Sequence, residues 1–304
     1  MSSSPAAAAP FPGPVGVAGL GAIGGGVAGA LVRAGADVRL YDVRPEAAAT
    51  FAGSATAVAS PAELGAASRV VVVAVVDDAQ VRAVLSGPDG VLGAMEPGGA
   101  VLILSTVTVP TVLDVAAEAE RQGVAVLDCG VTGGPAAAAS GELVALVGGA
   151  EADVALVRPV LDAFSVLVMH MGGLGAGLQA KLARNIVTYG AWLAAWEGQR
   201  LAEAAGIELS KLAEAIRTSE KRTGGTTALM FRDTVAPWPA DADAGIVTAM
   251  RNGATLAHKD LRAAMELGRT LGIELPVAAL TEGSCDAMFG FAPAAGSDED
   301  GERP

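Results

Sequence analysis

The sequence predicts an α/β protein in which a doubly wound, mainly parallel sheet is followed by an all-α second domain. Between residues 15 and 170, short runs rich in Val, Leu and Ile alternate with Ala-rich stretches, at the spacing of βαβ units. After Gly172 this strand signal disappears. Aromatic residues make up only 4% of the 304 residues, whereas hydrophobic residues make up 52%, which favours helices packed on buried strands over an aromatic-rich β-sandwich.

Seven strands are expected in the first half of the chain. Most of the aliphatic runs are continuous rather than alternating with polar residues, as strands covered by helices on both faces require. The expected strands span residues 15–18, 37–41, 70–75, 101–104, 124–127, 143–147 and 166–169.

The second half is expected to consist of helices, and the first of them, over about residues 174–205, joins the two domains. One face of this helix is marked by residues three to four apart, namely Leu178, Leu182, Asn185, Tyr189, Trp192 and Trp196. Ser210 is the expected N-cap of the next helix, Gly272 ends a later one and Pro276 begins the last.

The sheet domain is expected to span residues 15–172 and the helical domain residues 173–292. Residues 1–14 are rich in Ser, Ala and Pro, and residues 293–304 are rich in Ala, Gly and acidic side chains. Both are expected to be disordered tails. The first tail has no Lys or Arg and several prolines, so it does not resemble a signal peptide.

Charge and composition exclude several classes of protein. The net charge of -13 argues against binding to nucleic acid, which requires a positive surface. No apolar run reaches the roughly 20 residues that cross a bilayer, and two distant cysteines favour a reduced, cytoplasmic protein over a disulfide-stapled one. No metal site is expected. The apolar helical domain predicts a homodimer or homotetramer.

A glycine-rich loop follows the first expected strand and opens a helix. It reads Gly19-Leu20-Gly21-Ala22-Ile23-Gly24, a GxGxxG pattern. The first glycine permits the tight turn, the second lets a pyrophosphate approach the backbone, and the third lets the helix pack closely on the strand. The amides at the start of the helix then face the phosphates. This is typical of a Rossmann dinucleotide-binding domain.

An acidic residue, Asp42, lies at the position where a Rossmann domain binds the adenosine ribose of its cofactor. Asp42 directly follows the second expected strand, where a carboxylate accepts hydrogen bonds from the adenosine ribose and repels a 2′-phosphate. This favours NAD as the cofactor. NADP stays open, because Arg44 is close enough in sequence to reach a 2′-phosphate.

A second glycine-rich segment combines a hydroxyl with two glycines. It reads Asp-Cys-Gly-Val-Thr-Gly-Gly over residues 128–134 and is followed by Gly141-Glu142-Leu143. The hydroxyl of Thr132 and the amides of Gly133 and Gly134 form a small cradle suited to a carboxylate.

A third segment places a lysine and an asparagine on one face of the long helix. Lys181 and Asn185 follow the stretch Gly172-Gly173-Leu174-Gly175 and are four residues apart, so they can meet one substrate. Desolvation of the lysine on this apolar turn lowers its pKa toward the range of proton exchange.

Together with the glycine loop, these segments resemble the β-hydroxyacid dehydrogenases, the family of 3-hydroxyisobutyrate dehydrogenase and tartronate semialdehyde reductase, over residues 15–291. The family patterns are D-A-P-V-S-G-G and G-x-G-x-x-x-K-x-x-N-N. This chain departs from them at Cys129 and Gly130, which replace Ala-Pro, at Thr132, which replaces Ser, and at Arg184, which replaces the first Asn.

The resemblance implies hydride transfer between a nicotinamide cofactor and a small 3-hydroxy acid or its semialdehyde or keto acid. Lys181 would be the general acid/base, Asn185 would orient the substrate hydroxyl, and Thr132, Gly133 and Gly134 would hold its carboxylate. Lys259, in a His-Lys-Asp-Leu segment, and Ser105-Thr106, which precede Pro110, match family segments near the nicotinamide. The expected cofactor contacts are Gly19, Leu20, Gly21, Ala22, Ile23, Gly24, Asp42, Val43, Arg44, Val76, Ser105, Thr106 and Lys259.

Three other interpretations stay open. An imine reductase shares this architecture but usually has another residue where Lys181 stands. A decarboxylating enzyme acting on a phosphorylated sugar acid would use Lys221-Arg222 to meet a phosphate, although a solvated charge cluster explains this pair equally. A non-catalytic cofactor-binding scaffold would be expected to have lost the proton-transfer residue, but Lys181 is present at that position.

Overall fold

The computed structural model describes residues 10–292, so the expected tails over residues 1–9 and 293–304 lie outside the described part. The chain divides into two compact units, the first ending at Arg184 and the second beginning at Asn185. The boundary expected after residue 172 stays a prediction, and the compact first unit extends 12 residues further, into the long helix. The reason is that the first turns of the long helix pack on the sheet of the first unit.

Residues 10–14 belong to the fold rather than to a tail. Phe11 packs against the hydrophobic core, and the carbonyl of Pro14 accepts a hydrogen bond of 2.8 Å from the amide of Arg69. The composition of this stretch indicated disorder, but these two contacts fix its last residues beside the sheet.

The first unit contains an eight-stranded sheet in the order β3-β2-β1-β4-β5-β6-β7-β8. All neighbours are parallel except β6 and β7, which are antiparallel. The chain reverses direction along the sheet after β3, so the carboxyl ends of β1 and β4 meet at a topological switch point, where ligands bind in doubly wound sheets. The strands are β1 (Val15–Ala18), β2 (Val38–Tyr41), β3 (Thr56–Ala57), β4 (Val70–Val73), β5 (Ala100–Ile103), β6 (Ala125–Thr132), β7 (Leu143–Gly148) and β8 (Ser165–Gly172).

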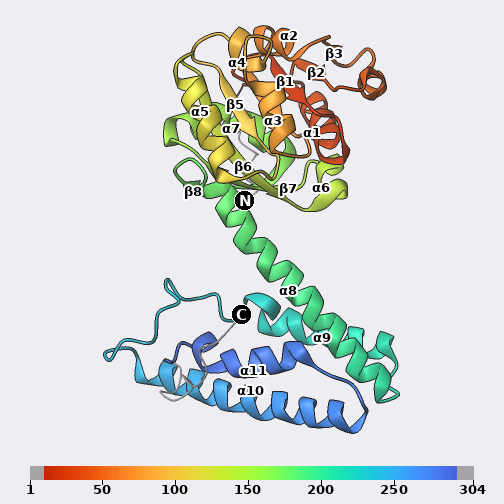
Figure 1. Ribbon diagram of the computed structural model, residues 1–304, viewed down its shortest axis with the longest axis vertical. Helices are drawn as coiled ribbons and strands as arrows, with labels where there is room; N and C mark the ends of the chain where they lie inside the picture. The colour runs from red at the N-terminus through yellow and green to blue at the C-terminus, as the bar shows by residue number, and fades with distance from the viewer. Residues whose placement is uncertain (1–9, 293–304) are drawn as a thin grey trace, which may run out of the picture. The chain divides into compact units, whose positions relative to one another are not determined.

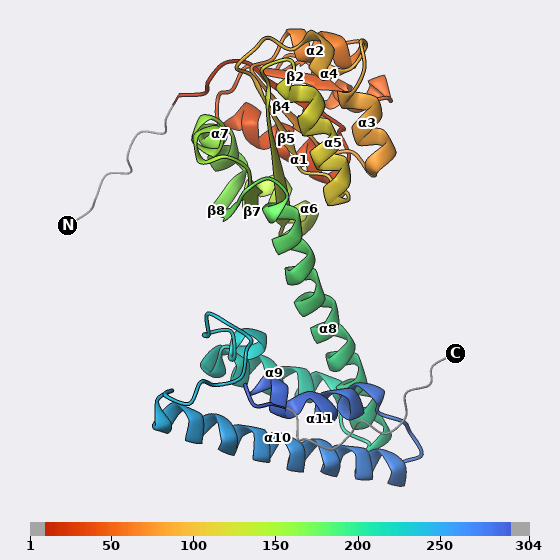
Figure 2. The same cartoon turned by 60° about the vertical axis from the view of Figure 1, so that its left-hand side comes forward.

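Helices cover both faces of this sheet, as Figures 1 and 2 show. Along β4, Val70 and Val72 belong to one hydrophobic core, and Val71 and Val73 belong to the other. This two-residue period buries every side chain of the strand, which explains its continuous aliphatic sequence. The first core also includes residues of α1 (Ala22–Arg33), α6 (Gly134–Ser140) and α7 (Glu151–Phe164), and the second includes residues of α2 (Pro61–Ala66), α3 (Asp78–Leu85), α4 (Val91–Ala94) and α5 (Val109–Glu120).

The sequence-based expectation of a doubly wound sheet is confirmed, with differences at individual strands. The edge strand β3 was not expected, because its two residues are exposed and carry no apolar run. Strand β6 extends to Thr132, five residues beyond its predicted end, because its second half pairs with β7.

Helix α8 (Ala176–Ala204) packs on the sheet through glycines that leave no room for a side chain. A Cβ atom on Gly177 would lie 2.3 Å from the carbonyl oxygen of Leu146, and one on Gly130 would lie 2.5 Å from the Cβ of Lys181. A Cβ on Gly148 would lie 2.8 Å from the amide nitrogen of Gly177. The start of the helix therefore sits in backbone contact with β6 and β7.

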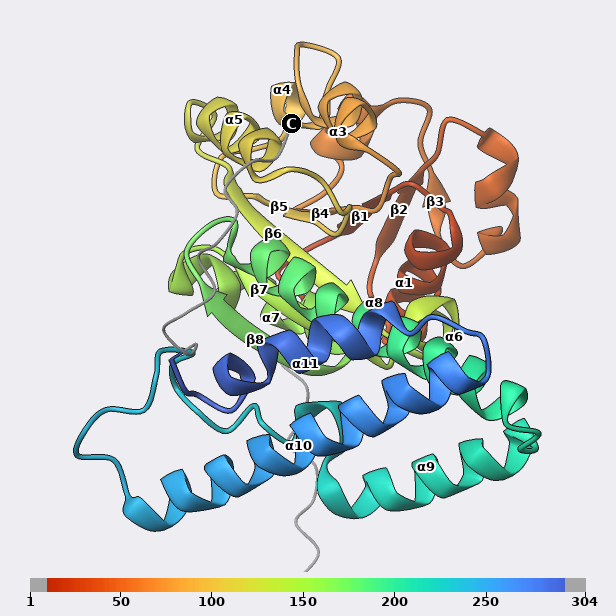
Figure 3. The same cartoon turned by 60° about the horizontal axis from the view of Figure 1, so that its bottom comes forward.

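The second unit is helical, as expected. After the residues of α8 from Asn185 onward come α9 (Leu209–Thr223), the short 3₁₀ turn η2 (Gly225–Thr227), α10 (Ala244–Thr270) and α11 (Pro276–Met288). Helices α10 and α11 pack side by side, as Figure 3 shows.

Two of the three predicted helix ends in this unit are confirmed. Gly272 adopts a left-handed φ of 71° just past α10, and Pro276 begins α11. The prediction of Ser210 as an N-cap is wrong, because α9 begins at Leu209, with Glu208 at the cap two residues before Ser210. Instead, the hydroxyl of Ser210 donates to the carboxylate of Glu208.

Over residues 10–292, the helices are all too short or too polar to cross a bilayer.

Replacing Gly177 with alanine tests the seating of α8. The new methyl group would press on backbone atoms of β7, so we expect the free energy of unfolding to fall by about 1–3 kcal/mol, as for overpacked sites. Urea denaturation of the full chain measures it. Gly190→Ala, in the same helix with open space around its Cβ, is the matched control and should be neutral or stabilising by roughly 0.5–1 kcal/mol. Equal stability of the two variants would contradict the packing argument.

Candidate active site

The glycine-rich loop joins β1 to α1 in the conformation that its sequence predicts. Gly19 has a left-handed φ of 88°, and a Cβ there would lie 2.6 Å from the carbonyl oxygen of Ala74. A Cβ on Gly24 would lie 1.9 Å from the carbonyl oxygen of Gly19, so helix and loop can pack this closely only with glycine. Gly21 has open space on its Cβ side. The first turn of α1 begins directly after it, with Ala22 and Ile23.

The carboxylate of Asp42 ties the end of β2 to this loop. One of its oxygens accepts a hydrogen bond of 2.7 Å from the amide of Leu20, and the other accepts bonds from the amide and the Nε of Arg44 at 2.9 and 3.1 Å. Burial alone would raise the pKa of Asp42, but the bonds from Arg44 and from the backbone of Leu20 outweigh it and lower the pKa. The carboxylate therefore stays ionised beside the loop.

A cavity of about 390 Å³ lies beside the loop, between the ends of β1, β2 and β4. Six of the residues predicted to contact the cofactor line it: Gly19, Gly21, Asp42, Val43, Arg44 and Val76. An open backbone at Gly21, an ionised carboxylate and an adjoining cavity fit the pyrophosphate and ribose of a dinucleotide. The sequence analysis missed Tyr41, Ala74, Val75, Gln80, Ala83 and Val84, which also line the cavity.

Gln80 could have been found by its position. It lies in the first turn of the helix that follows β4, and its side-chain oxygen accepts a hydrogen bond of 3.1 Å from the amide of Val76. A polar residue at that place holds the loop after the strand at the cavity edge.

Ser105 and Thr106 lie at the end of β5, and only the second is exposed. Ser105 is 4% exposed, and its hydroxyl accepts a hydrogen bond of 2.9 Å from the amide of Val75. Its side chain therefore joins the loop after β4 to the end of β5. Contact of either residue with a cofactor stays a prediction.

The predicted substrate loop follows β6. Thr132 is the last residue of the strand, and Gly133 and Gly134 have φ values of 124° and 75°. Both glycines therefore adopt backbone conformations that side chains disfavour. The space around a Cβ on Gly134 is open, so its backbone is accessible to a ligand.

Lys181 meets this loop from the second turn of α8. Its ammonium donates a hydrogen bond of 2.5 Å to the carbonyl of Val131, the residue before Thr132. Desolvation by burial is the largest influence on Lys181 and lowers its pKa, with a further lowering by Arg184 that is opposed by Cys129. The structure thus brings a half-buried amine, with a depressed pKa, to the predicted carboxylate cradle.

The other predicted residues lie in the second unit. Asn185 follows Lys181 by one helical turn in α8 and is the first residue of the second unit. Lys259 lies on α10, is 69% exposed and forms an ion pair of 3.1 Å with Asp260. Their roles stay predictions.

We interpret Cys129 and His170 as packing or loop residues. Cys129 is fully buried, and burial raises the pKa of its thiol, which keeps it protonated and unreactive. His170 places Nε2 2.9 Å from the carbonyl oxygen of Gly149. Over the residues that the structure describes, no three His, Cys, Asp or Glu side chains gather as a metal site requires.

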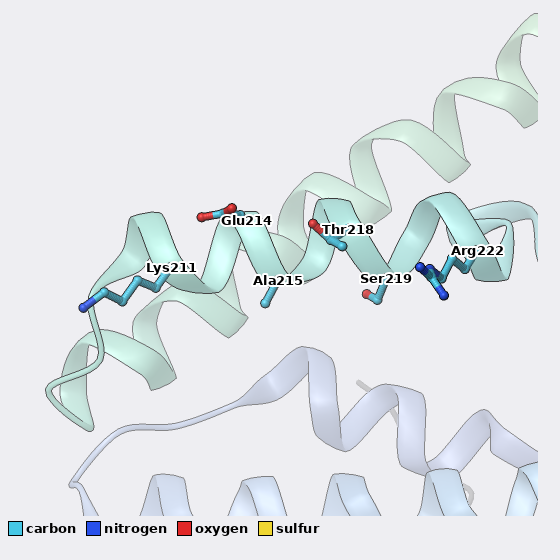
Figure 4. A pocket seen from close by; sticks show the side chains of 6 residues that line it. All are labelled: Lys211, Glu214, Ala215, Thr218, Ser219 and Arg222. Carbon is cyan, nitrogen blue, oxygen red and sulfur yellow. The ribbon is translucent and has the colours of Figure 1, made fainter.

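Arg222 lines a shallow hollow of about 490 Å³ on the second unit, whereas Lys221 does not. Figure 4 shows that all of its lining side chains come from one helix, α9. They are Lys211, Glu214, Ala215, Thr218, Ser219 and Arg222. A single helix surrounds no ligand, so the anion contact expected of Lys221-Arg222 stays a prediction.

Comparison with known proteins agrees with this geometry. A family model described as the NAD binding domain of 6-phosphogluconate dehydrogenase matches residues 14–173. A second, described as the NAD-binding domain of NADP-dependent 3-hydroxyisobutyrate dehydrogenase, matches residues 175–302.

Relatives resemble the chain over most of its length. An uncharacterized oxidoreductase of Mycobacterium tuberculosis is 39% identical over 88% of this chain and 90% of its own. The L-threonate dehydrogenase of Cupriavidus necator is 37% identical over 67% of this chain and 70% of its own. A crystal structure of a Mycobacterium avium protein, described as an oxidoreductase, is 34% identical, covers 91% of this chain and 98% of its own, and has a TM-score of 0.83.

Imine reductases share the fold alone. The enzyme of a Pseudomonas species is 19% identical over 90% of this chain and 92% of its own, with a TM-score of 0.64. The two family models and the relatives agree with the motifs, and the chain belongs to the β-hydroxyacid dehydrogenase family.

Proposed function

We propose that this protein oxidises a small 3-hydroxy acid, or reduces the corresponding semialdehyde or keto acid, with Lys181 as the general acid/base. The observation that carries the proposal is the half-buried amine of Lys181, hydrogen-bonded to the carbonyl of Val131 at the edge of a hydroxyl-and-glycine loop. When bound, the nicotinamide cofactor supplies or accepts the hydride.

The side chains of this site would divide the work as follows. The hydroxyl of Thr132 and the amides of Gly133 and Gly134 would hold the substrate carboxylate, and Asn185 would orient the hydroxyl group. In the oxidative direction, the neutral amine of Lys181 removes the hydroxyl proton. In the reductive direction, its ammonium returns a proton to the carbonyl oxygen. The lowered pKa of Lys181 supports this role, because both forms then become accessible nearer neutral pH.

The second unit is the basis for proposing a homodimer or homotetramer. Successive turns of α8 expose large apolar side chains, including Ile186, Tyr189, Trp192 and Trp196 at 54% or more. Exposed apolar surface of this extent is typical of an interface. The carboxylate cradle and the cavity lie within the first unit, so self-association does not alter the assignment of Lys181.

The alternatives predict different substrates. An imine reductase would reduce cyclic imines, and a scaffold would turn over neither hydroxy acids nor imines. A decarboxylating enzyme would require a phosphorylated acid and would lose affinity for it in Lys221→Ala. A panel of these three substrate classes, assayed by absorbance of the reduced cofactor, separates them.

Replacing Lys181 with alanine tests the acid/base role. We expect kcat to fall by about 10² to 10⁴, the usual contribution of a general acid/base, while cofactor affinity measured by fluorescence titration stays unchanged. Lys211→Ala is the control, because Lys211 is an exposed lysine paired with Glu208 on α9. Near-normal turnover by Lys181→Ala would exclude the role.

The contacts of Asp42 favour NAD over NADP. Arg44 directs its guanidinium at Asp42, so the pair has little net positive charge for a 2′-phosphate. Asp42→Asn keeps an acceptor for Leu20 but removes the negative charge, and we expect the NADP to NAD ratio of kcat/KM to rise about tenfold or more, the effect of roughly 1.4 kcal/mol. Arg44→Ala should keep the preference for NAD. A wild-type preference for NADP that Arg44→Ala abolishes would reverse the assignment.

Light scattering of the purified chain measures its association. The chain has a mass of 29.9 kDa, and we expect two or four times this mass, because the apolar residues of α8 gain from burial against another copy. Trp192→Ser together with Trp196→Ser should shift the mass toward that of one chain. A single-chain mass for the unaltered protein would contradict the proposed association.

A further inference from the structure

We propose that Asp128 is a positioning residue for Lys181. Both of its carboxylate oxygens bind the start of α8, and they set the depth and the rotation at which this helix presents its lysine to the substrate loop. The inference depends on the proposed acid/base role of Lys181 and adds to it the residue that places the amine.

The contact between Asp128 and the helix is short and buried. One carboxylate oxygen accepts a hydrogen bond of 2.6 Å from the amide of Gly175, and the other accepts a bond of 2.7 Å from the amide of Leu178. The side chain is fully buried. The first amide directly precedes α8 and the second is in its first turn, where amides have no partner within the helix. The carboxylate and the helix end therefore satisfy each other where water cannot.

Strand β6 then meets the helix at two further points, both close to Lys181. Gly130 lies two residues after Asp128, on the same face of the strand, and a Cβ there would lie 2.5 Å from the Cβ of Lys181. The carbonyl of Val131 accepts the hydrogen bond from the ammonium of Lys181. Leu178, whose amide binds Asp128, precedes Lys181 by three residues and so lies on the same side of the helix. A change at the cap is thus transmitted to Lys181 within one turn.

The charge of Asp128 has a second effect on the helix. A carboxylate at a helix start complements the partial positive charge of the free amides. Lys181 is in the second turn, where the helix-end effect is already weaker, so we expect only a small change in its pKa. Loss of the carboxylate would make the start of the helix less favourable for an ammonium group.

A second buried carboxylate provides a matched control on the same helix. Glu197 is 4% exposed, and its oxygens accept bonds of 2.9 and 2.8 Å from the amides of Val277 and Ala278 at the start of α11. The two interactions are alike in chemistry and burial. They differ in place, because Glu197 is more than four turns of α8 away from Lys181.

The test compares Asp128→Asn with Glu197→Gln in the cofactor-free and in the active protein. Each amide keeps the size of the original side chain and one acceptor oxygen but loses the second acceptor and the charge. The pKa of Lys181 is read from the chemical shift of its ¹³Cε atom in cofactor-free protein. Kinetic constants and the pH dependence of oxidation are measured beside it.

We expect Asp128→Asn to lower the pKa of Lys181 by on the order of half a unit, as the loss of a charge at a helix end predicts. The oxidation rate rises with pH as the amine loses its proton, and this rise should shift to lower pH by the same amount. We expect kcat to fall about tenfold, as misplacement of a catalytic group predicts, with KM for the cofactor unchanged. Glu197→Gln should match the stability loss but leave the pKa of Lys181 and kcat unchanged.

An unchanged pKa of Lys181 in Asp128→Asn, with kinetic losses no larger than those of Glu197→Gln, would overturn the inference. If Asp128→Asn does not fold, Gly175→Ala perturbs the same cap from the helix side, since Gly175 has a φ of 93°. This variant keeps the charge of Asp128, so the fall in kcat, with KM for the cofactor unchanged, must appear there. The failure of the proposed function looks different. If the proposed function fails, the rise of the oxidation rate with pH persists in Lys181→Ala. If only the inference about Asp128 fails, Lys181→Ala removes this rise, and Asp128→Asn leaves it at the same pH as in the unaltered protein.

Discussion

The seating of α8 on strands β6 and β7 is the constraint on which the site depends. Backbone lies against backbone there, because Gly130, Gly148 and Gly177 leave no room for side chains. Close packing of this kind fixes the position of the helix, because an added methyl group would meet backbone atoms that cannot move aside as a flexible side chain can. The buried carboxylate of Asp128 then satisfies the amides that a helix start leaves free.

The chemistry of Lys181 follows from this packing. A lysine on a free helix would extend into water and keep its ordinary pKa. On the seated helix, its stem lies against Gly130 and its ammonium reaches the carbonyl of Val131, so burial lowers its pKa. The same contact that stabilises the junction of helix and sheet therefore lowers the pKa of the amine, as the proposed acid/base role requires.

A carboxylate also holds the backbone at the glycine-rich loop of the first unit. Asp42 binds the amide of Leu20 and the side chain of Arg44, so one carboxylate holds the glycine-rich loop and orients a cation at the edge of the cavity. In both places a carboxylate holds the backbone that precedes or begins a helix: Asp42 directly follows β2, and Asp128 pairs with the last residue of β5. Parallel strands place such residues at one edge of the sheet, where ligands bind.

The sequence by itself determined the sheet, its two helical layers and the glycine-rich loop, because continuous aliphatic runs and fixed glycine spacings act locally. It also indicated Lys181, through a motif in which Asn185 follows four residues later. Only the tertiary structure decided that Asp128 caps the helix of Lys181, that Ser105 joins two strand ends and that the first unit extends to Arg184. These features depend on contacts between residues about 30 to 50 positions apart, and such contacts leave no periodic signal in the chain.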